Sequence, residues 1–96
     1  MRPKIKRHIC SEHTAKFSLF KPNGIPASEL IKTVLETDEF EAVRLVDMLQ
    51  LSQQEAALEM QVSRQTFANI LKSSRKKITT ALVQGNALQL TKIVTT

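Results

Sequence analysis

Residues 51–71 decide the predicted fold of this chain, and they read LSQQEAALEMQVSRQTFANIL. Ser52 and Ser63 each stand directly before a run of residues that favours helix, where a hydroxyl can accept a free backbone N–H and begin the helix. Glu55 follows Ser52 at the spacing of a capping box, in which each side chain binds the backbone N–H of the other residue. The stretch therefore predicts two helix starts close together.

The two predicted helices, about 53–60 and 64–84, are separated by a tight turn that contains Gln61 and Val62. Residues before each cap are apolar, as in a hydrophobic staple. Gly85 is a suitable end for the second helix, because glycine tolerates the left-handed conformation that ends many helices. A chain that ends one helix and begins another at once must change direction, and this is the arrangement of a helix-turn-helix unit.

The second predicted helix has two chemically different sides. At about 100° per residue, one arc collects the residues that we expect to face the core: Phe67, Ile70, Leu71, Ser74, Ile78, Ala81 and Leu82. The opposite side carries two amides and two ammonium groups, Gln65, Asn69, Lys72 and Lys76. The flanks carry Arg64, Ala68 and Arg75 on one side and Lys77 on the other. Because this helix contains no acid, a polyanion can approach its outward side without repulsion.

These side chains suit the major groove of double-stranded DNA, which admits one α-helix and displays the base edges. Gln65 and Asn69 can each pair with adenine, whereas Arg64 favours guanine. Ala68 is small enough for close approach and can contact a thymine methyl group. We therefore expect these four residues to contact bases. Phosphate contacts are expected from the start of the helix and from its cations, Ser63, Lys72, Arg75, Lys76 and Lys77.

The net charge of +5 is unevenly distributed along the chain. Residues 63–96 contain six basic side chains and no acid, residues 1–16 form a second basic segment, and residues 17–62 are acidic overall. This pattern favours a polyanion-binding surface, and the alternative is a solvated charged surface that keeps the protein soluble. The segment 1–16 is predicted to be a flexible arm. It either contacts a minor groove or phosphates, or only solubilises the terminus, through Arg2, Lys4, Lys6 and Arg7.

The remaining segments predict a mainly α fold of three to four helices. Apolar residues recur at helical spacing over residues 27–35, and Thr37 followed by two acids marks the start of a helix over 38–50. Residues 17–20 are a candidate short strand. Residues 88–94 are a candidate strand or an ordered tail, because their apolar alternation is only partial.

Several segments resemble the family called domain of unknown function 134, a group of small predicted DNA-binding proteins of bacteria and archaea. The resemblance extends from about Arg2 to Leu88 and rests on KPNGIPASEL (21–30), DEFEAVRLVDMLQLSQQEAA (38–57), VSRQTFANIL (62–71) and KKITTALVQGNAL (76–88). It implies DNA binding through a helix-turn-helix similar to the fourth conserved region of bacterial sigma factors, without naming a target. The chain departs from the family at Gln61, where glycine is usual. Glutamine in a left-handed conformation costs about 1 kcal/mol relative to glycine.

Other site types receive little support from the sequence. His8, Cys10 and His13 are metal-ligand types, but a structural zinc site needs four ligands and the chain has no further Cys or His, so we expect no metal. We expect neither an enzyme nor a cofactor, because the chain has no glycine-rich phosphate loop and its acids between 36 and 41 suit a helix start. A single cysteine and the lack of a long apolar run indicate a cytoplasmic protein without a membrane segment.

We therefore predict one domain, residues 17–96, that binds double-stranded DNA sequence-specifically. It would act as a transcriptional regulator and form a homodimer or a higher homo-oligomer. The alternative is a protein-interaction module in which the acidic face of residues 36–59 binds RNA polymerase or another regulator, with DNA binding secondary or absent. RNA binding is a weaker alternative, because the four phenylalanines are the only aromatic residues and most occupy predicted core or strand positions.

Overall fold

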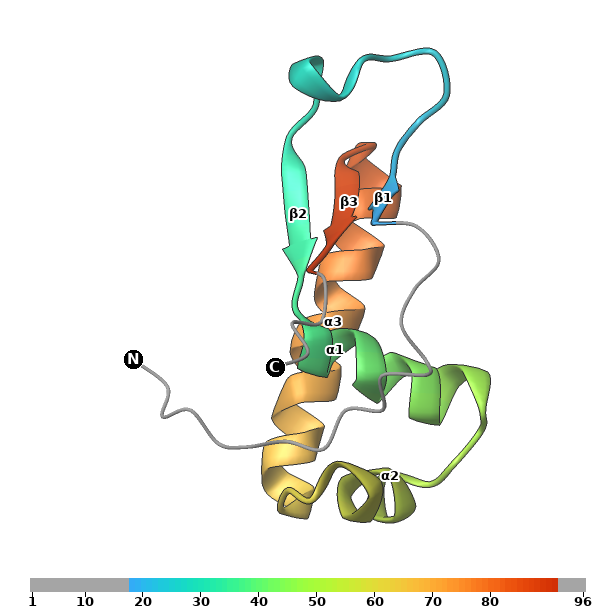
Figure 1. The fold of residues 1–96 in the computed structure, drawn as a ribbon, viewed down its shortest axis with the longest axis vertical. Coiled ribbons are helices and arrows are strands. Elements are labelled where there is room, and N and C mark those ends of the chain that lie inside the picture. The colour runs from blue at the N-terminus through green and yellow to red at the C-terminus, as the bar shows by residue number, and fades with distance from the viewer. Residues whose placement is uncertain (1–17, 92–96) are drawn as a thin grey trace.

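A computed structural model describes residues 18–91 of the chain, and within them three α-helices accompany a small mixed sheet (Figure 1). The helices are α1 (Thr37–Val43), α2 (Gln53–Met60) and α3 (Arg64–Gln84). The strands are β1 (Leu19–Phe20), β2 (Lys32–Leu35) and β3 (Ala87–Leu90). Two short turns of other helix types complete the described segments, η2 (Ala27–Glu29, 3-10) and η3 (Arg44–Met48, π). The predicted mainly α fold class is confirmed.

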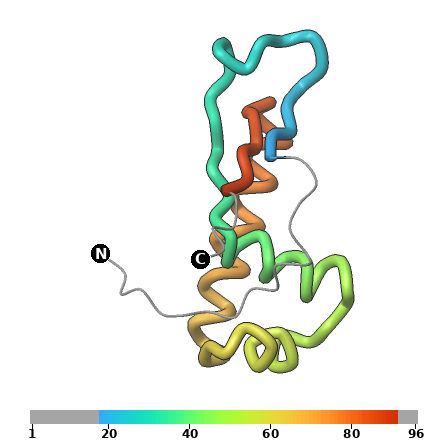
Figure 2. Tube along the Cα trace, in the orientation of Figure 1, coloured from blue at the N-terminus to red at the C-terminus, as the bar shows by residue number. Residues whose placement is uncertain are grey.

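The long helix α3 connects the two ends of the domain (Figures 1 and 2). Near its start it packs against α2, in its middle it is crossed by α1, and toward its end it lies behind the sheet. The sheet has the order β1-β3-β2, with β3 antiparallel to β1 and parallel to β2. The first half of α3 therefore lies at the end of the domain that is remote from the sheet.

The helix predicted over residues 27–35 is wrong. The structure has the η2 turn there, followed by β2, in which exposed Lys32 and Val34 alternate with half-buried Thr33 and buried Leu35. This alternation is the period of a strand, and the β-branched residues of the segment favour it. A short apolar segment can fit the period of a helix as well as that of a strand. Pairing with β3, which lies far along the chain, selects the strand, and periodicity within the segment cannot detect that partner.

The helix predicted over 38–50 is present but differs at both ends. It begins at Thr37, and its second half is the π-helical η3, which ends at Met48. The expected Thr37 cap is wrong, because Glu36 is the capping residue and its N–H donates to Glu39 Oε1 at 2.9 Å. A carboxylate is a stronger hydrogen-bond acceptor than a hydroxyl, so the Glu39 side chain satisfies this end of the helix.

The caps predicted for α2 and α3 are confirmed. Glu55 N–H donates to Ser52 Oγ at 3.1 Å, and Ser52 N–H donates to Glu55 Oε1 at 2.9 Å. Ser63 Oγ accepts the Thr66 N–H at 3.1 Å, and Gly85 ends α3 in the left-handed conformation with φ 70°. The candidate strands at 17–20 and 88–94 are present as the shorter β1 and β3, and the predicted positions 17 and 92–94 lie outside the described residues.

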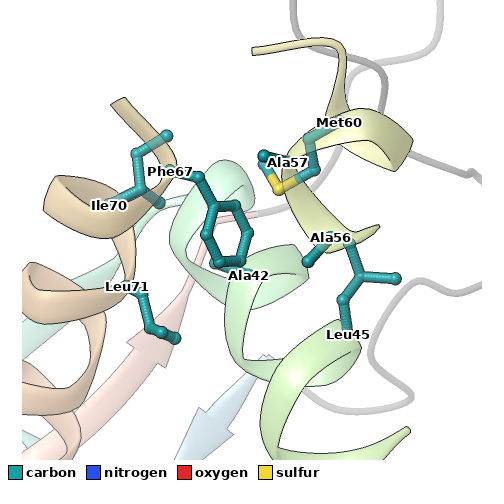
Figure 3. Close-up of a cluster of buried hydrophobic side chains, with 8 residues drawn as sticks. All are labelled: Ala42, Leu45, Ala56, Ala57, Met60, Phe67, Ile70 and Leu71. Atoms are coloured by element: carbon teal, nitrogen blue, oxygen red, sulfur yellow. The ribbon is translucent and has the colours of Figure 1, made fainter. Parts of the chain in front are cut away.

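A core of small and large apolar side chains joins α1, η3, α2 and α3. Its buried members are Ala42, Leu45, Ala56, Ala57, Met60, Phe67, Ile70 and Leu71. Figure 3 shows the Phe67 ring at the centre, between Ala42 of α1 and the alanines of α2. The small alanines let α1 and α2 approach closely around the fully buried Phe67 ring of α3.

Leu82, which we expected in the core, is 79% exposed. It lies at the margin of the predicted apolar arc of α3. In its first half, α3 packs against both α1 and α2, which together bury a wide arc of its surface. Near its end, α3 packs mainly against the sheet. Leu71 and Leu82 both lie near the edge of the apolar arc, but only Leu71 is buried, and Leu82 is exposed to solvent.

Candidate nucleic-acid interface

The turn between α2 and α3 sets the direction in which α3 leaves the core. Gln61 has φ 58° and ψ 43°, a left-handed conformation, and Val62 N–H donates to the Ala57 carbonyl at 3.1 Å. Glutamine thus keeps the conformation that glycine would adopt more easily, at a cost of about 1 kcal/mol. Val62 packs against the core beside α3. The turn is consequently tight, although its sequence departs from the glycine expected at Gln61.

Four polar side chains of α3 lie opposite the core and Arg64 lies on the flank beside them, and we call these five residues the outer row: Arg64, Gln65, Asn69, Lys72 and Lys76. All five are exposed, and none takes part in an ion pair within residues 18–91. The Gln65 amide nitrogen donates to Asn69 Oδ1 at 3.4 Å, so the two amides lie next to each other. Ala68 is half-buried beside them. The four residues that we expected to contact bases are therefore neighbours on the first half of α3.

Ser63, an expected phosphate ligand, uses its hydroxyl group to cap the start of α3. Its hydroxyl accepts the Thr66 N–H and donates to Thr66 Oγ1 at 2.9 Å, so the side chain caps α3. The first backbone N–H groups of a helix have no partner within the helix, and they carry the positive end of its dipole. A phosphate at this position would bind these N–H groups rather than the Ser63 hydroxyl.

Lys77, another expected phosphate ligand, is half-buried and contacts α1. Its ammonium group lies 2.7 Å from Glu39 Oε1. Ser73 donates its hydroxyl to the second carboxylate oxygen of Glu39, and the Ser74 hydroxyl donates to the Glu39 carbonyl at 2.8 Å. We call these four residues the polar joint. It connects the second half of α3 to the start of α1, and the carboxylate of Glu39 balances the charge of Lys77.

The polar joint stabilises the charged form of Glu39. Burial alone raises the pKa of this carboxyl group, whose side chain is only 4% exposed. The hydrogen bonds from Lys77, Ser73 and the Glu36 N–H, with the nearby Lys77 charge, together outweigh burial. The net result is a pKa of Glu39 below the 4.5 of an unperturbed glutamate, so the carboxylate is ionised at neutral pH.

Arg75 also contacts the body of the protein, but at the surface. Its guanidinium binds the Asp47 carboxylate through two hydrogen bonds, at 2.7 and 3.2 Å. The hydrogen bonds raise the pKa of Arg75 and lower that of Asp47. Both side chains are about half exposed, 49% and 46%, so water and salt weaken the pair. Arg75 can therefore exchange Asp47 for another anion at small cost.

The acids of α1 are mostly inside the protein. Asp38, Glu39 and Glu41 are buried, and Glu41 accepts two hydrogen bonds from Arg44 at 2.7 and 2.9 Å. Sequence reasoning assigned these acids to a helix start and missed the role of Glu39 in anchoring α3. The spacing within residues 36–41 carries no sign of a partner 38 positions later in the chain.

Some predicted sites lie outside the described residues. They include the basic arm residues Arg2, Lys4, Lys6 and Arg7 and the considered metal ligands His8, Cys10 and His13. Within residues 18–91, no cluster of acids, histidines and cysteines has the composition of a metal site. None of the helices in this described part combines the length and hydropathy needed to cross a lipid bilayer.

Comparison with known proteins identifies the family. A family model described as "Protein of unknown function DUF134" matches residues 1–92. A UPF0251 protein of Shewanella halifaxensis is 56% identical over 89 residues, which cover 93% of this chain and 91% of the relative. A UPF0251 protein of Aeromonas salmonicida is 54% identical over 89 residues, with 93% and 85% covered. No solved structure matches the chain. The resemblance seen in the sequence is confirmed, and the chain belongs to the DUF134 family.

Proposed function

We propose that this protein binds double-stranded DNA sequence-specifically through a helix-turn-helix formed by α2 and α3, and that it regulates transcription. The observation that carries the proposal is the outer row of α3. This row offers two adjacent amides and three cations to solvent on a helix that has no acid, while the opposite side of the same helix is buried. A row of this composition suits contact with base edges and phosphates.

The outer row divides into two expected roles. Arg64, Gln65 and Asn69 lie in the first half of α3 and would contact base edges in the major groove, with Ala68 against a thymine methyl group. Lys72 and Lys76 follow on the same side and would bind backbone phosphates. In this proposal α2 would brace α3 from behind through the core alanines.

The two cations that contact acids have a different expected role. Lys77 would mainly anchor α3 to α1, because its charge is used by buried Glu39. Arg75 would contribute to phosphate binding only by leaving Asp47, and the exposure of that pair makes the exchange inexpensive. The phosphate contacts are thus expected to depend more on Lys72 and Lys76 than on the other two cations.

The alternative, an acidic surface over residues 36–59 that docks a protein partner, receives less support. Three of its acids are buried, Asp38, Glu39 and Glu41. Asp47 is exposed but bound to Arg75. The acids of this segment that remain exposed without such a pair are Glu36, Glu55 and Glu59, and Glu55 caps α2. These acids offer less negative surface than the sequence suggested.

The proposal is tested by measuring the affinity of the chain for duplex DNA by fluorescence anisotropy at several salt concentrations. Wild-type protein is first used to select bound fragments from random DNA, and the selected duplex is then compared with a random one. We expect affinity to fall steeply with salt on both duplexes, with a clear preference for the selected one. A matched control replaces Gln84, an exposed amide at the far end of α3, with alanine and should leave the preference unchanged.

Two results would contradict the proposal. The first is that micromolar protein shows no salt-sensitive binding to any duplex, which would favour a protein-interaction module instead. The second is that the Gln65→Ala, Asn69→Ala and Gln84→Ala variants all behave alike on selected and random DNA. Contacts to the base edges would then not depend on the first half of α3.

A further inference from the structure

One edge of the sheet is open in the described part of the protein. Within residues 18–91, β2 pairs with β3 only and is the last strand in the order β1-β3-β2. The Ile31 carbonyl accepts the Ala87 N–H at 2.8 Å, and the Leu35 carbonyl accepts the Thr91 N–H at 3.0 Å. Odd-numbered residues of this segment thus turn their main-chain groups toward β3. Because the direction alternates along a strand, the N–H and C=O of Val34 point toward the open edge.

The side chains along this edge have charges that match those of a second, antiparallel copy of the same edge. Lys32, Val34 and Glu36 alternate with the other residues, so in an extended segment they lie on one face, and all three are exposed. Neither Lys32 nor Glu36 takes part in an ion pair within residues 18–91. Along the edge, the cation Lys32, the apolar Val34 and the anion Glu36 therefore follow one another, and a second copy in the antiparallel direction presents them in the opposite order.

We propose that β2 is a self-association site, at which two copies of this chain pair antiparallel to form a twofold dimer. In the proposed register Val34 faces Val34 of the partner subunit, and the two residues exchange both of their main-chain hydrogen bonds. Lys32 then faces Glu36 of the partner subunit, and the twofold axis repeats this ion pair. The occupant of the open edge is therefore a second copy of the same chain.

Charge complementarity favours this register over its neighbour. If the strands slide by two residues, so that Lys32 faces Val34 of the partner subunit, Glu36 faces an apolar leucine. Both charges then lose an opposite partner, and the main-chain groups of Val34 no longer meet their own copies. Directly opposed cross-strand charges stabilise antiparallel pairs when they differ in sign and destabilise them when they agree.

The proposed dimer keeps both outer rows available. The twofold axis of such a pair runs perpendicular to the sheet, and α3 lies on only one face of the sheet (Figure 1). Both copies of α3 would therefore lie on the same face of a six-stranded sheet. Dimer formation does not depend on DNA binding, so the two proposals can fail separately.

Sedimentation velocity with two charge-reversal variants, without DNA, tests the pairing. Lys32→Glu alone opposes two acids across the edge, and Glu36→Lys alone opposes two lysines, so each variant should raise the dimer dissociation constant about tenfold. Mixing the two variants in equal amounts restores an opposite-sign pair on both sides of the axis. We expect the mixture to dimerise at least as well as the wild type. Circular dichroism verifies that each variant is folded.

Site-specific cross-linking tests the register. In a Cys10→Ser background, Val34→Cys should form an intermolecular disulfide rapidly on oxidation, since the Cα atoms of a facing hydrogen-bonded pair lie about 5.5 Å apart. Leu58→Cys, at a site on α2 that is 72% exposed, serves as the control for random collision. The proposal is overturned by a wild-type chain that stays monomeric at hundreds of micromolar. It is also overturned by a mixture that associates no better than its components, or by a Val34→Cys variant that cross-links no faster than the Leu58→Cys variant.

Discussion

The outer row and the polar joint both include lysines of α3, yet these lysines differ in what they contact. In the outer row, Lys72 and Lys76 are exposed and make no ion pair within the described residues. In the polar joint, Lys77 is the next residue along the helix, but its ammonium group lies 2.7 Å from buried Glu39. One step of about 100° around the helix separates a cation available to a ligand from one that holds the fold together.

This difference teaches that a basic segment cannot be treated as one surface. Cations that face solvent contribute to a polyanion-binding field, whereas a cation paired with a buried carboxylate mainly balances the charge of its partner. The two sets should therefore respond differently to substitution. Changes in the buried and anchored side of α3 should alter folding stability, and changes in the outer row should alter DNA binding.

The largest expected effect is on the buried side of α3. Phe67 is fully buried at the centre of the core, so Phe67→Ala should lower the free energy of unfolding by about 3–5 kcal/mol. Gln65→Ala, two residues away but exposed, should change it by less than about 0.5 kcal/mol. Urea denaturation followed by circular dichroism measures both values. Similar losses in the two variants would show that the two sides of α3 are not distinct in folding.

The polar joint should give a smaller loss of stability, and one that depends on pH. Glu39→Gln removes the charge that Lys77 pairs with, and we expect a loss of about 1.5–3 kcal/mol at pH 7. Because the pKa of Glu39 is lowered in the folded protein, its contribution is complete above the unfolded pKa near 4.5 and disappears as pH falls through the folded value. Urea midpoints of wild type and variant between pH 3 and 7 measure this difference.

The same pH series needs an exposed glutamate as a control. Glu29→Gln, in the η2 turn, should change the urea midpoint little at any of these pH values. If the difference between wild type and Glu39→Gln stayed constant down to pH 3, the ionised carboxylate would not be what stabilises the joint.

Removing a side chain that contacts bases should lower the affinity for the selected duplex only. Gln65→Ala or Asn69→Ala should weaken binding to the selected duplex by about 1–3 kcal/mol and leave binding to random duplex almost unchanged. The stability of both variants should equal that of the wild type, because both side chains are exposed. Anisotropy titrations on the two duplexes measure the effect. An equal loss on both would mean that these amides do not distinguish bases.

The smallest expected effect separates two neighbouring cations. Lys76→Ala should weaken binding to all duplexes alike and reduce the slope of log affinity against log salt by about 1. Arg75→Ala should change that slope less, because Arg75 must first leave Asp47. Lys21→Ala, an exposed cation in the loop after β1, is the control. A larger change in slope for Arg75→Ala than for Lys76→Ala would contradict this division of roles.

Local signals in the sequence predicted most of the helical part of the domain. The capping box of Ser52 and Glu55, the Ser63 cap and Gly85 depend only on residues within a few positions, and each has the predicted geometry. The exposure of Gln65, Asn69, Lys72 and Lys76 followed from helical periodicity alone.

Features that depend on distant partners were not predictable in this way. Residues 32–35 form a strand because β3 pairs with them, and nothing inside the segment identifies that partner. In the same way, the expected phosphate ligand Lys77 pairs with Glu39, a residue on another helix. A single sequence gives the charge of such residues but not the contact that uses it.

The central claim is that the outer row of α3 binds duplex DNA, and backbone amide shifts in an NMR titration test it most directly. The wild-type chain is titrated with a random duplex and then with the selected one, at low and moderate salt. We predict the largest shift changes along α3 from Arg64 to Lys76, with little change in β2 and β3. Shift changes concentrated in α1 and the sheet, or none in α3 at either salt concentration, would contradict the claim.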